Sequence, residues 1–354
     1  MKKFRRIGIL TSGGDAPGMN AAIRAVTREA IANGVEVMGI MRGYSGLIDG
    51  DIRPFSVRDV SNCLNHGGTM LYSDRCPEFC TEEGMKKAIA TCEKFLIDGI
   101  VVIGGDGTFR GAQDLTHRGI PCIGLPGTID NDITSTEFTI GFDTAMNTTL
   151  DLVDKLRDTC ESHARCNVVE VMGRGAGDIA LETAVASGAT AVAIPEIPFD
   201  VEGTIAKIRA SRALGKRTFI VIVSEGMGEE YAPMLAKRIQ KDTGVETKFA
   251  RFAHIVRGGI PTLRDRLMAT RMGKRAVEEL FLGNSNLVVC ERGGEIVTAN
   301  INYALTLDRL YKGKATEEEL AAYSEEEIAE MKRVGDKKRA LFRELYDCID
   351  RLSL

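Results

Sequence analysis

The sequence predicts an α/β protein with two Rossmann-like lobes, each built on a mostly parallel sheet. Short apolar runs alternate with amphipathic segments along the chain, and glycine-rich loops follow several of the runs. The 354 residues are also enough for two lobes. Such alternation is typical of βαβ units, in which helices cover a parallel sheet. Because no repeat, low-complexity tract or Pro-rich linker interrupts it, we expect short hinges between the lobes.

The predicted strands are short runs of mostly apolar residues, as expected for buried parallel strands. They cover residues 7–10, 35–40, 99–105, 121–127, 167–173, 191–195, 217–223, 248–254 and 286–291. The predicted helices are amphipathic and include residues 17–32, 83–97, 142–160, 229–242 and 261–282. From Thr316 to about Leu354 the chain is charged, with apolar residues at helical spacing, so we expect one or two terminal helices that serve packing.

Composition narrows the class of protein. The chain carries 46 basic and 50 acidic residues, a net charge of −4, without a long block of one sign before the C-terminal region. This balance argues against a general nucleic-acid binder. The nine cysteines are odd in number and scattered, without CxxC pairs, which favours reduced thiols in a cytoplasmic protein. Polar TSGGD interrupts the apolar run after MKKFRR, so we expect neither a signal peptide nor a membrane contact.

Four glycine-rich loops stand at the ends of predicted strands and carry the functional prediction. They are TSGGDAPGMN (11–20), IGGDGTFRG (103–111), LPGTIDND (125–132) and VMGRGAGD (171–178). Glycine lets a ligand approach the backbone closely, and the helix that follows presents free N–H groups to an anion. One such loop is weak evidence for a phosphate site, but four that each carry a polar residue are hard to explain as turns alone.

The basic residues near these loops are candidate phosphate ligands, because guanidinium groups donate in a planar fork and keep their charge. They are Arg75, Arg165, Arg174 and Arg257. The chain has no GxxxxGK[ST] motif, which excludes a P-loop enzyme, and no GxGxxG with an acidic residue at the right distance, which disfavours a dinucleotide oxidoreductase.

Phosphoryl transfer requires a divalent metal on the donor phosphates, cations on the transferred group and a carboxylate that accepts a proton. Asp106 in GGDGT is the candidate Mg²⁺ ligand, since Mg²⁺ in such sites takes one or two carboxylates plus phosphates and water. Asp130 or Asp132 is left as the base. For Asp132 we prefer a helix cap or a partner that holds Asp130. Asp15 is equally a cap of the helix that starts near Pro17 or a ligand contact.

These motifs together resemble the bacterial-type ATP-dependent 6-phosphofructokinases, over nearly the whole chain. The resemblance is carried by TSGGDAPGMNAAIR (11–24), RCPEF (75–79), VVIGGDGT (101–108), PGTIDNDI (126–133), TIGFDTA (139–145), VEVMGR (169–174) with GD (177–178), and RGG (257–259). GGDGT alone is ambiguous, because NAD kinases and lipid kinases have a similar loop. PGTIDND with MGR and RCPEF is specific.

The resemblance implies which residues carry out phosphoryl transfer and which bind ATP. Asp130 would be the base that deprotonates the sugar 1-hydroxyl, with Thr128 beside it. Asp106 would hold Mg²⁺, while Arg75 and Arg174 neutralise the migrating phosphoryl group. ATP would lie on Gly14, Tyr44, Arg75, Cys76, Gly105, Gly107, Thr108 and Gly111. On the residues alone, Cys76 is a packing residue whose backbone lines the adenine site.

The resemblance likewise implies a sugar-phosphate site that two subunits complete in a homotetramer. Fructose 6-phosphate would be held by Met172, Gly173, Arg174, Glu225, His254 and Arg257, joined by Arg165 and Lys248 of a neighbouring subunit. Lys248 departs from the usual Arg, which replaces a fork by a point charge. Without its motif, His254 reads as a structural imidazole, whereas Glu225 follows an apolar strand and suits sugar-hydroxyl recognition.

Two glycines bear on the phosphoryl donor. Pyrophosphate-using relatives have Asp in place of Gly107 and Lys in place of Gly127, so glycine at both positions favours ATP by analogy and on steric grounds. The alternatives left open are a pyrophosphate-dependent phosphofructokinase and a non-catalytic regulator that binds nucleotide or sugar phosphate. Intact Asp106, Asp130, Arg75 and Arg174 disfavour the regulator.

The family's effector pocket, which takes ADP or phosphoenolpyruvate, is matched only in part. Its cations are present as Arg24, Arg28, Arg157 and Lys216. Thr190 stands where relatives have Glu, and Leu214 where they have a basic residue, which puts regulation in doubt.

The expected domains are discontinuous. A larger ATP-binding lobe comprises 1–141 plus about 256–306, and a smaller lobe for fructose 6-phosphate comprises 142–255 plus about 307–325. Residues 326–354 form a charged helical extension.

Overall fold

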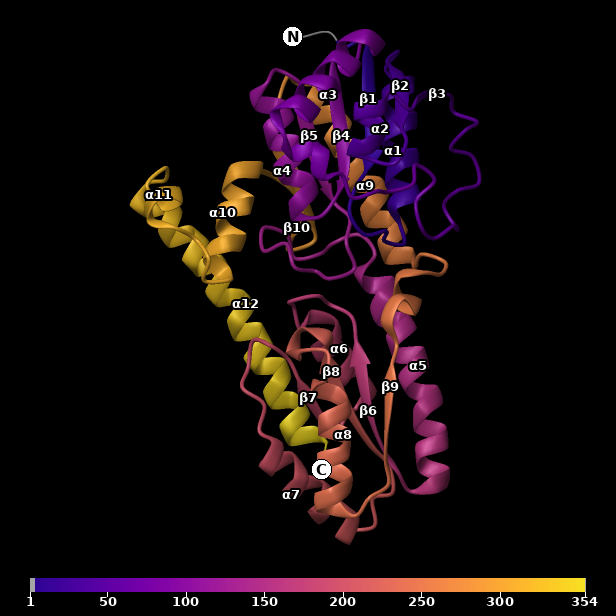
Figure 1. Ribbon diagram of the computed structural model, residues 1–354, viewed down its shortest axis with the longest axis vertical. Coiled ribbons are helices and arrows are strands. Elements are labelled where there is room, and N and C mark those ends of the chain that lie inside the picture. Colours follow the sequence, from indigo (N-terminus) through magenta and orange to yellow (C-terminus); the bar gives the residue numbers. More distant parts are fainter. Residues whose placement is uncertain (1–3, 354) are drawn as a thin grey trace. The chain divides into compact units, whose positions relative to one another are not determined.

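The computed structural model describes residues 4–353, which divide into two compact units (Figure 1). The first unit contains the chain up to Ile129, then Ile133–Thr144 and Arg257–Gly335. The second contains Asp130–Asp132, Ala145–Val256 and the chain from Asp336 onward. Each unit has its own sheet and its own apolar core.

A seven-stranded sheet in the order β11-β10-β5-β4-β1-β2-β3 forms the centre of the first unit (Figure 1). Its strands are β1 (Arg6–Thr11), β2 (Glu36–Ile40), β3 (Ile52–Phe55), β4 (Gly99–Gly104), β5 (Cys122–Pro126), β10 (Leu287–Arg292) and β11 (Glu295–Asn300). All neighbours pair in parallel except β2 with β3 and β10 with β11, at the two edges. The predicted α/β class with mostly parallel sheets is confirmed.

The two antiparallel edge strands were not expected from the sequence. β3 contains Pro54, which cannot donate to a ladder and is therefore confined to sheet edges. β11, of sequence EIVTAN, is half-exposed along its length. Neither strand is a buried apolar run, and the strands were predicted from such runs alone. β3 and β11 were therefore missed.

The helices of the first unit follow its strands in alternation. They are α1 (Met19–Ala32), α2 (Tyr44–Asp49), η1 (Pro77–Cys80), α3 (Glu82–Phe95), α4 (Asp106–His117), α9 (Leu263–Phe281), α10 (Ile301–Tyr311) and α11 (Glu317–Leu320). α1 and α9 pack closely at Gly273. A Cβ atom on Gly273 would lie only 2.8 Å from the Cβ atom of Ala25. Any side chain at position 273 would therefore push the two helices apart.

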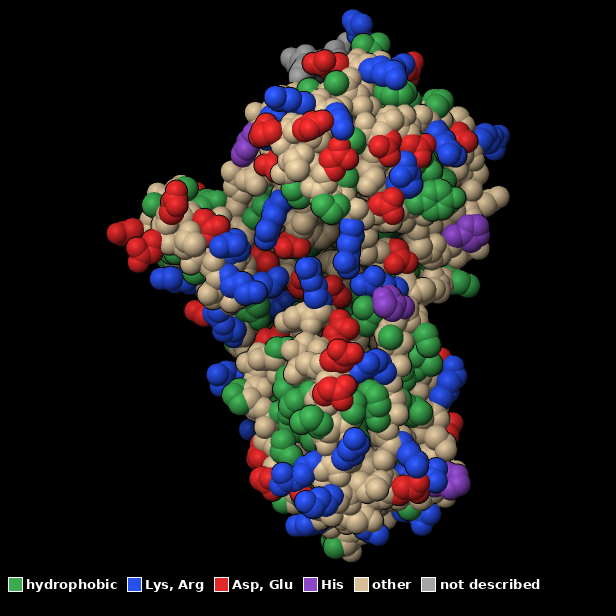
Figure 2. Space-filling model, in the orientation of Figure 1, with side chains coloured by type: hydrophobic (Ala, Val, Ile, Leu, Met, Phe, Trp, Pro, Cys, Tyr) green, Lys and Arg blue, Asp and Glu red, His purple; other side chains and the backbone are tan. Residues whose placement is uncertain are grey.

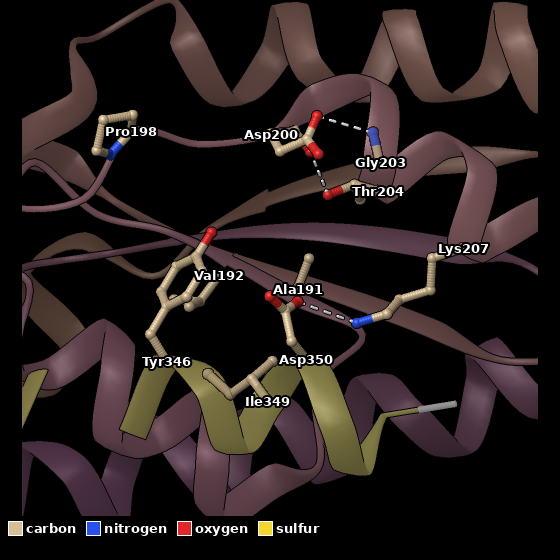
Figure 3. Close-up of a pocket in the computed structure, with 10 residues that line it drawn as sticks. All are labelled: Ala191, Val192, Pro198, Asp200, Gly203, Thr204, Lys207, Tyr346, Ile349 and Asp350. Carbon is tan, nitrogen blue, oxygen red and sulfur yellow. Dashed lines mark hydrogen bonds and ion pairs between the residues drawn. The ribbon is translucent and has the colours of Figure 1, made fainter. Parts of the chain in front are cut away.

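The second unit is a four-stranded parallel sheet in the order β7-β8-β6-β9. Its strands are β6 (Cys166–Val171), β7 (Ala191–Ala193), β8 (Phe219–Ser224) and β9 (Thr247–Arg251). Its helical segments are α5 (Phe142–His163, whose first turn belongs to the first unit), α6 (Asp178–Ser187), α7 (Val201–Ala213), η2 (Glu225–Met227), α8 (Tyr231–Thr243), η3 (Ala253–Arg257) and the last part of α12 (Glu325–Leu352). Side chains from the last turns of α12 face α7 and β7 around a cavity (Figure 3).

Several expected domain boundaries differ from the observed units. Residues 130–132, expected in the larger lobe, belong to the second unit, and residues 142–144, expected in the smaller lobe, belong to the first. Residues 307–325, expected in the smaller lobe, belong to the first unit. The reason is that α10 buries Ile301 and Ala304 in the core of the first unit, while the Asp308 carboxylate accepts the Thr134 hydroxyl at 2.7 Å. The expected extension 326–354 is divided as well, since the boundary between the units falls inside α12 after Gly335.

Charge and thiols agree with the compositional analysis. Basic and acidic side chains lie among each other on the face that Figure 2 shows. All nine cysteines are free. In the part of the chain that the structure describes, no helix has the length and apolar content needed to cross a bilayer.

Asp265 on α9 gives the first unit a pH-dependent stability. Its side chain is fully buried and accepts the backbone N–H groups of Gly141 at 2.6 Å and Thr144 at 2.8 Å. Burial raises the pKa of this carboxyl to about 6. The folded state therefore binds more protons than the unfolded state between the two pKa values, so this contribution to stability is full at low pH and is lost as pH rises through about 6.

We predict that Asp265→Asn removes this dependence. From pH 4 to 7 the free energy of unfolding of the wild type should fall relative to that of the variant by about 3 kcal/mol at most. The variant also loses one acceptor, but that cost applies at every pH. Chemical denaturation of both proteins at several pH values measures the difference, in which the other titrating groups cancel. Parallel stability curves would contradict the prediction.

Candidate active site

Three of the four predicted loops come together at one edge of the first unit's sheet. β5, β4 and β1 are consecutive parallel strands, so the loops 11–20, 103–111 and 125–132 leave from adjacent carboxyl ends. The backbone N–H of Ser12 donates to the carbonyl of Ile103, and that of Gly127 to the carbonyl of Gly104, both at 3.0 Å. Open α/β sheets bind their ligands at this edge.

The second loop passes directly into α4 and leaves its N-terminus open. Gly105 is the N-cap, and the Thr108 hydroxyl donates to the Ser12 carbonyl at 3.1 Å, which ties α4 to the first loop. A Cβ atom on Gly104 would lie 2.3 Å from that carbonyl, so only glycine fits there. A Cβ atom on Gly105 or Gly107 would have no atom within 4 Å. The helix N-terminus thus faces free space, as an anion site requires.

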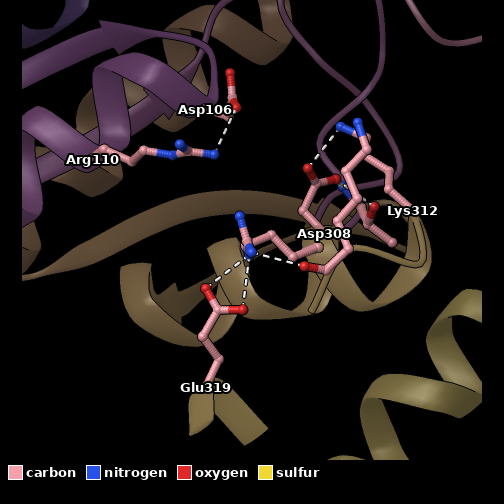
Figure 4. Close-up of polar contacts among 8 residues, drawn as sticks. Asp106, Arg110, Asp308, Lys312 and Glu319 are labelled. Atoms are coloured by element: carbon pink, nitrogen blue, oxygen red, sulfur yellow. Dashed lines mark hydrogen bonds and ion pairs between the residues drawn. The ribbon is translucent and has the colours of Figure 1, made fainter. Parts of the chain in front are cut away.

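Asp106 is the first residue of α4 and the only predicted metal ligand. Its side chain is 28% exposed and forms an ion pair of 3.4 Å with Arg110, one turn later (Figure 4). The described residues contain no group of three or more His, Cys, Asp or Glu that could hold a metal. A Mg²⁺ ion that takes most of its ligands from phosphates and water fits this single carboxylate. The exposed pair with Arg110 is weak and can open.

Tyr44 supports α4 from within the core. Its ring is 5% exposed and stacks on Phe79 with 4.0 Å between centroids, and its hydroxyl donates to the Thr108 carbonyl at 2.6 Å. Burial keeps the pKa of this hydroxyl well above its usual value, so it remains a donor. A Cβ atom on Gly111 would lie 2.7 Å from the ring, and Cys76 is half-buried against the same core. All three were predicted ATP contacts, and that role stays a prediction.

Two predicted arginines flank the first loop. The Ser73 hydroxyl donates to the Gly13 carbonyl at 2.5 Å, which brings the segment leading to the exposed Arg75 beside this loop. A Cβ atom on Gly14 would lie 3.1 Å from Nη1 of Arg257. Arg257, predicted to bind the sugar phosphate, therefore lies in the first unit against a predicted ATP contact. Its Nε is buried without a hydrogen-bond partner among the described residues.

Two interpretations as helix caps are wrong. α1 begins at Met19 with Gly18 as its N-cap, so Asp15 does not cap it. Asp132 precedes no helix, since the next one, α5, begins at Phe142. The N-cap position of α1 is taken by Gly18, whose φ is +109°. A Cβ atom on Gly18 would lie 2.7 Å from the Ile140 side chain. The role of Asp132 as a partner of Asp130 stays a prediction.

The third loop carries Thr128 and Asp130 and crosses from the first unit to the second after Ile129. The Thr128 carbonyl accepts the Thr139 hydroxyl at 2.7 Å. Asp130 is 8% exposed, and the next residue, Asn131, has a left-handed backbone with φ of +50°. A non-glycine residue in this region needs contacts that hold it there.

The fourth loop follows β6 in the second unit and is held by Glu225. This residue follows β8, the parallel neighbour of β6, and its Oε1 accepts the backbone N–H groups of Gly173 at 3.2 Å and Arg174 at 2.7 Å. Arg174 has φ of +56° and an exposed side chain. One carboxylate oxygen of Glu225 thus supports the loop, in addition to the sugar recognition that the sequence predicted. Met172 is buried and His254, in η3, is exposed.

Arg165 and Lys248 lie together, at the other end of the same sheet. Glu246 pairs with both, at 2.7 Å to Arg165 Nε and 2.9 Å to Lys248 Nζ, and these cations lower its pKa to about 2. Arg165 precedes β6, whereas Gly173 follows it, so about 20 Å of strand separates them. Glu246 was not predicted from the sequence, because its position just before β9 carries no motif signal.

The predicted effector residues are distributed over both units. Arg24 and Arg28 lie on α1 in the first unit, while Arg157 on α5 and Lys216 lie in the second. The substituted positions behave differently from each other, because Leu214 is 90% exposed whereas Thr190 is buried.

Residues 6–280 match the family model described as phosphofructokinase. An ATP-dependent 6-phosphofructokinase of Bacillus pumilus is 50% identical over 323 residues, 91% of this chain and 99% of its own. That of Clostridium botulinum strain Loch Maree is 51% identical over 308 residues, 87% of this chain and 96% of its own.

Solved structures show the same likeness. Phosphofructokinase from Saccharomyces cerevisiae superimposes with a TM-score of 0.82 at 29% identity over 93% of this chain, which spans 49% of the yeast chain. A pyrophosphate-dependent phosphofructokinase from Marinobacter aquaeolei gives a TM-score of 0.73 at 25% identity, over 84% of this chain and 83% of its own. The chain belongs to the phosphofructokinase family, and its sequence relatives are of the bacterial ATP-dependent type.

Proposed function

We propose that this protein is an ATP-dependent 6-phosphofructokinase. It transfers the γ-phosphoryl group of ATP to the 1-hydroxyl of fructose 6-phosphate in glycolysis, and it releases fructose 1,6-bisphosphate and ADP. The observation that carries the proposal is the convergence of three glycine-rich loops on the open N-terminus of α4, in a chain about half identical to ATP-dependent relatives. Reduced thiols and glycolytic substrates fit a cytoplasmic enzyme.

The first unit binds the nucleotide in this proposal. The donor phosphates take the free space beside Gly105 and Gly107, where the N–H groups of α4 favour negative charge. Asp106 holds Mg²⁺, which when bound screens the charge of the phosphates. Arg75, exposed next to the first loop, approaches the transferred group. Tyr44 keeps the first turn of α4 in place through its bond to Thr108.

The second unit binds the sugar phosphate and supplies the base. Asp130 accepts the proton of the 1-hydroxyl as that oxygen attacks phosphorus, with Thr128 beside it. Arg174, set by Glu225, neutralises charge on the moving phosphoryl group. Thr128 belongs to the first unit and Asp130 to the second.

Two subunits complete each sugar-phosphate site in this proposal. Met172, Gly173, Arg174 and Glu225 stand at the carboxyl ends of strands, and His254 follows one; Arg165 and Lys248 stand near the amino ends of β6 and β9. One ligand cannot span both ends of β6, so Arg165 and Lys248 serve the site of a neighbour, in a homotetramer. Glu246 forms ion pairs with Arg165 and Lys248 and so keeps the two side chains together.

The test is a coupled assay of the purified protein with fructose 6-phosphate and Mg²⁺, with ATP or pyrophosphate as donor. Turnover with ATP and not with pyrophosphate is the expected result. Turnover with pyrophosphate alone would overturn the donor assignment, and turnover with neither would favour a non-catalytic binding protein. Adding ADP or phosphoenolpyruvate in parallel shows whether Thr190 and Leu214 have removed regulation.

Loss of the Glu225 carboxylate should weaken sugar-phosphate binding. We predict that Glu225→Ala raises KM for fructose 6-phosphate about 10- to 100-fold, because Gly173 and Arg174 lose a charged acceptor. Glu225→Gln keeps an acceptor oxygen and should stay within about tenfold of the wild type. Steady-state kinetics at saturating ATP measure this, with the exposed Glu229→Ala as control. A KM within twofold of wild type for Glu225→Ala would contradict the role.

A further inference from the structure

Asn131, the residue after Asp130, is held on both sides in its left-handed conformation. Its side-chain Nδ2 donates to Oδ1 of Asp178 at 3.2 Å. Its backbone carbonyl accepts from Nζ of Lys338, on α12, at 3.0 Å. All of these residues belong to the second unit. The backbone that follows the proposed base is therefore fixed by a side-chain contact and a main-chain contact.

Lys338 also forms an ion pair with the buried Asp178. Its Nζ lies 3.0 Å from Oδ1 of Asp178, and the two side chains are 18% and 4% exposed. Burial raises the pKa of Asp178, Lys338 lowers it, and the nearby Asp132 raises it further. Removing the lysine would leave a buried carboxylate without its cation, beside a loop that already carries two carboxylates.

We propose that Lys338 is a positioning residue for Asp130. One ammonium group holds the carbonyl of Asn131 and at the same time neutralises Asp178, which holds the Asn131 side chain. The inference rests on the proposed role of Asp130 as the base. A base must lie within hydrogen-bond reach of its proton, and a displacement of about 1 Å can cost about 100-fold in rate.

The test begins with Lys338→Met, which keeps the aliphatic stem and removes the charge and donors. We expect kcat to fall about 30-fold with both KM values within about threefold, because the base moves while the binding residues stay. Lys338→Arg should recover most of the rate. Lys332→Met, on an exposed position of the same helix, is the matched control and should not change kcat.

A double variant separates positioning from bulk stability. In Asp178→Asn with Lys338→Met the buried charge is gone, so kcat should rise about fivefold above that of Lys338→Met alone. If methionine is not tolerated at position 338, Lys338→Gln is judged by the same kcat and KM criterion. A kcat within twofold of wild type for Lys338→Met, or equal changes in kcat and both KM values without rescue by arginine, would overturn the proposal.

A readout without activity keeps this test independent of the proposed function. Amide hydrogen exchange of the peptide covering residues 127–133 should quicken in Lys338→Met and stay unchanged in Lys332→Met. Unchanged exchange in both variants would overturn the positioning role even in an active enzyme. If exchange quickens in Lys338→Met but the wild-type protein shows no ATP-dependent turnover, the positioning contact is supported and the proposed function is rejected.

A separate observation concerns the last turn of α12, which lies against a cluster of cations formed by Arg157, Lys207 and Lys216. Nζ of Lys207 is 3.2 Å from Asp350 (Figure 3) and 2.8 Å from the Ser353 hydroxyl. Nζ of Lys216 is 2.5 Å from the Ser353 carbonyl. Burial lowers the pKa of Lys216, and the charges of Lys207 and Arg157 lower it further. The cations are therefore close enough to repel one another.

The chain itself supplies the partners of these lysines. Ser353 is 4% exposed, and its hydroxyl donates to the Thr190 carbonyl at 3.2 Å. Tyr346, Ile349 and Asp350 close a cavity of about 240 Å³ against α7 and β7 (Figure 3). The Ser353 hydroxyl and carbonyl and the Asp350 carboxylate thus stand where a cation cluster would attract an anion.

We infer that the segment Tyr346–Ser353 is a built-in occupant of this cation cluster and closes it to small phosphorylated anions. The test compares the full chain with a chain that lacks residues 349–354, using inorganic phosphate as the probe in thermal unfolding. Phosphate at 20 mM should raise the Tm of the shortened chain by about 3 °C more than that of the full chain. Lys216→Ala in the shortened chain should abolish this difference, since phosphate bound elsewhere is unaffected.

Equal phosphate shifts in the full and shortened chains, or an increase that survives Lys216→Ala, would overturn the inference. If the shortened chain does not fold, Ile349→Asp releases the same turn by placing a charge on its buried face, and the same comparison applies.

Discussion

Replacing Asp130 by alanine should lower kcat by about three orders of magnitude while fructose 6-phosphate binds within about tenfold of its wild-type affinity. The expected split between rate and affinity follows from the role of a base, which acts on the proton that leaves in the transition state. Asp130 is 8% exposed, on a loop whose next residue is locked in the left-handed region. In Asp130→Ala a water molecule that takes the place of the carboxylate would therefore not be held in the same orientation. Single-turnover rates and sugar-phosphate titration measure the two quantities.

Asp132 provides the matched control, because it is the other carboxylate of the same loop. Asp132→Asn should lower kcat about tenfold at most, through its influence on Asp130 and on the pKa of Asp178. Near-normal turnover in Asp130→Ala would reject the assignment of the base. A loss in Asp132→Asn that equals the loss in Asp130→Ala would show that the two carboxylates act as one unit.

The sequence predicted the loops well because their signal is local. An apolar run followed by glycine and a polar residue is sufficient to place a loop at the carboxyl end of a strand. Parallel pairing of β1, β4 and β5 then brings Ser12, Gly104 and Gly127 together without further information. The class of the fold followed from the same alternation, and the family resemblance supplied the residues to which we assign the chemistry.

What the sequence could not predict depends on which atoms meet across the fold. Nothing in the sequence indicated that the Tyr44 ring is buried in the core, where Gly111 makes room for it. Nor did the sequence show that one oxygen of Glu225, a predicted sugar ligand, accepts backbone N–H groups of the fourth loop. Lys338 had no motif, and only tertiary packing brings it to Asn131. Boundaries inside α12 were missed because a continuous helical pattern has no signal where one unit ends.

The two glycines that favour ATP, Gly107 and Gly127, have different surroundings in the structure. A Cβ atom on Gly127 would lie 2.8 Å from Ile103 and 3.1 Å from Met19, so the space beside it is filled by the protein's own side chains. A Cβ atom on Gly107 meets nothing within 4 Å. The steric part of the donor argument therefore rests on Gly107, whereas a lysine at position 127 would first have to displace the core.

Gly107→Asp is accordingly the sharper test of the donor site. The new side chain has room in the protein, so the Tm should change by less than about 2 °C. It adds a carboxylate next to Asp106 in the space proposed for the ATP phosphates, and we expect kcat/KM for MgATP to fall about 100- to 1,000-fold. Affinity for fructose 6-phosphate, which we propose the second unit binds, should stay within about threefold.

Gln113→Asp is the matched control, because it adds the same charge to α4 six residues later. Its kcat/KM for MgATP should stay within about threefold of wild type, since the charge is distant from the open N-terminus. If Gly107→Asp also keeps its kcat/KM within threefold, the open face of α4 does not bind the donor phosphates, and the nucleotide site must be sought elsewhere in the first unit. If it loses ATP turnover and gains none with pyrophosphate, then the aspartate excludes ATP but does not by itself create a site for the shorter donor.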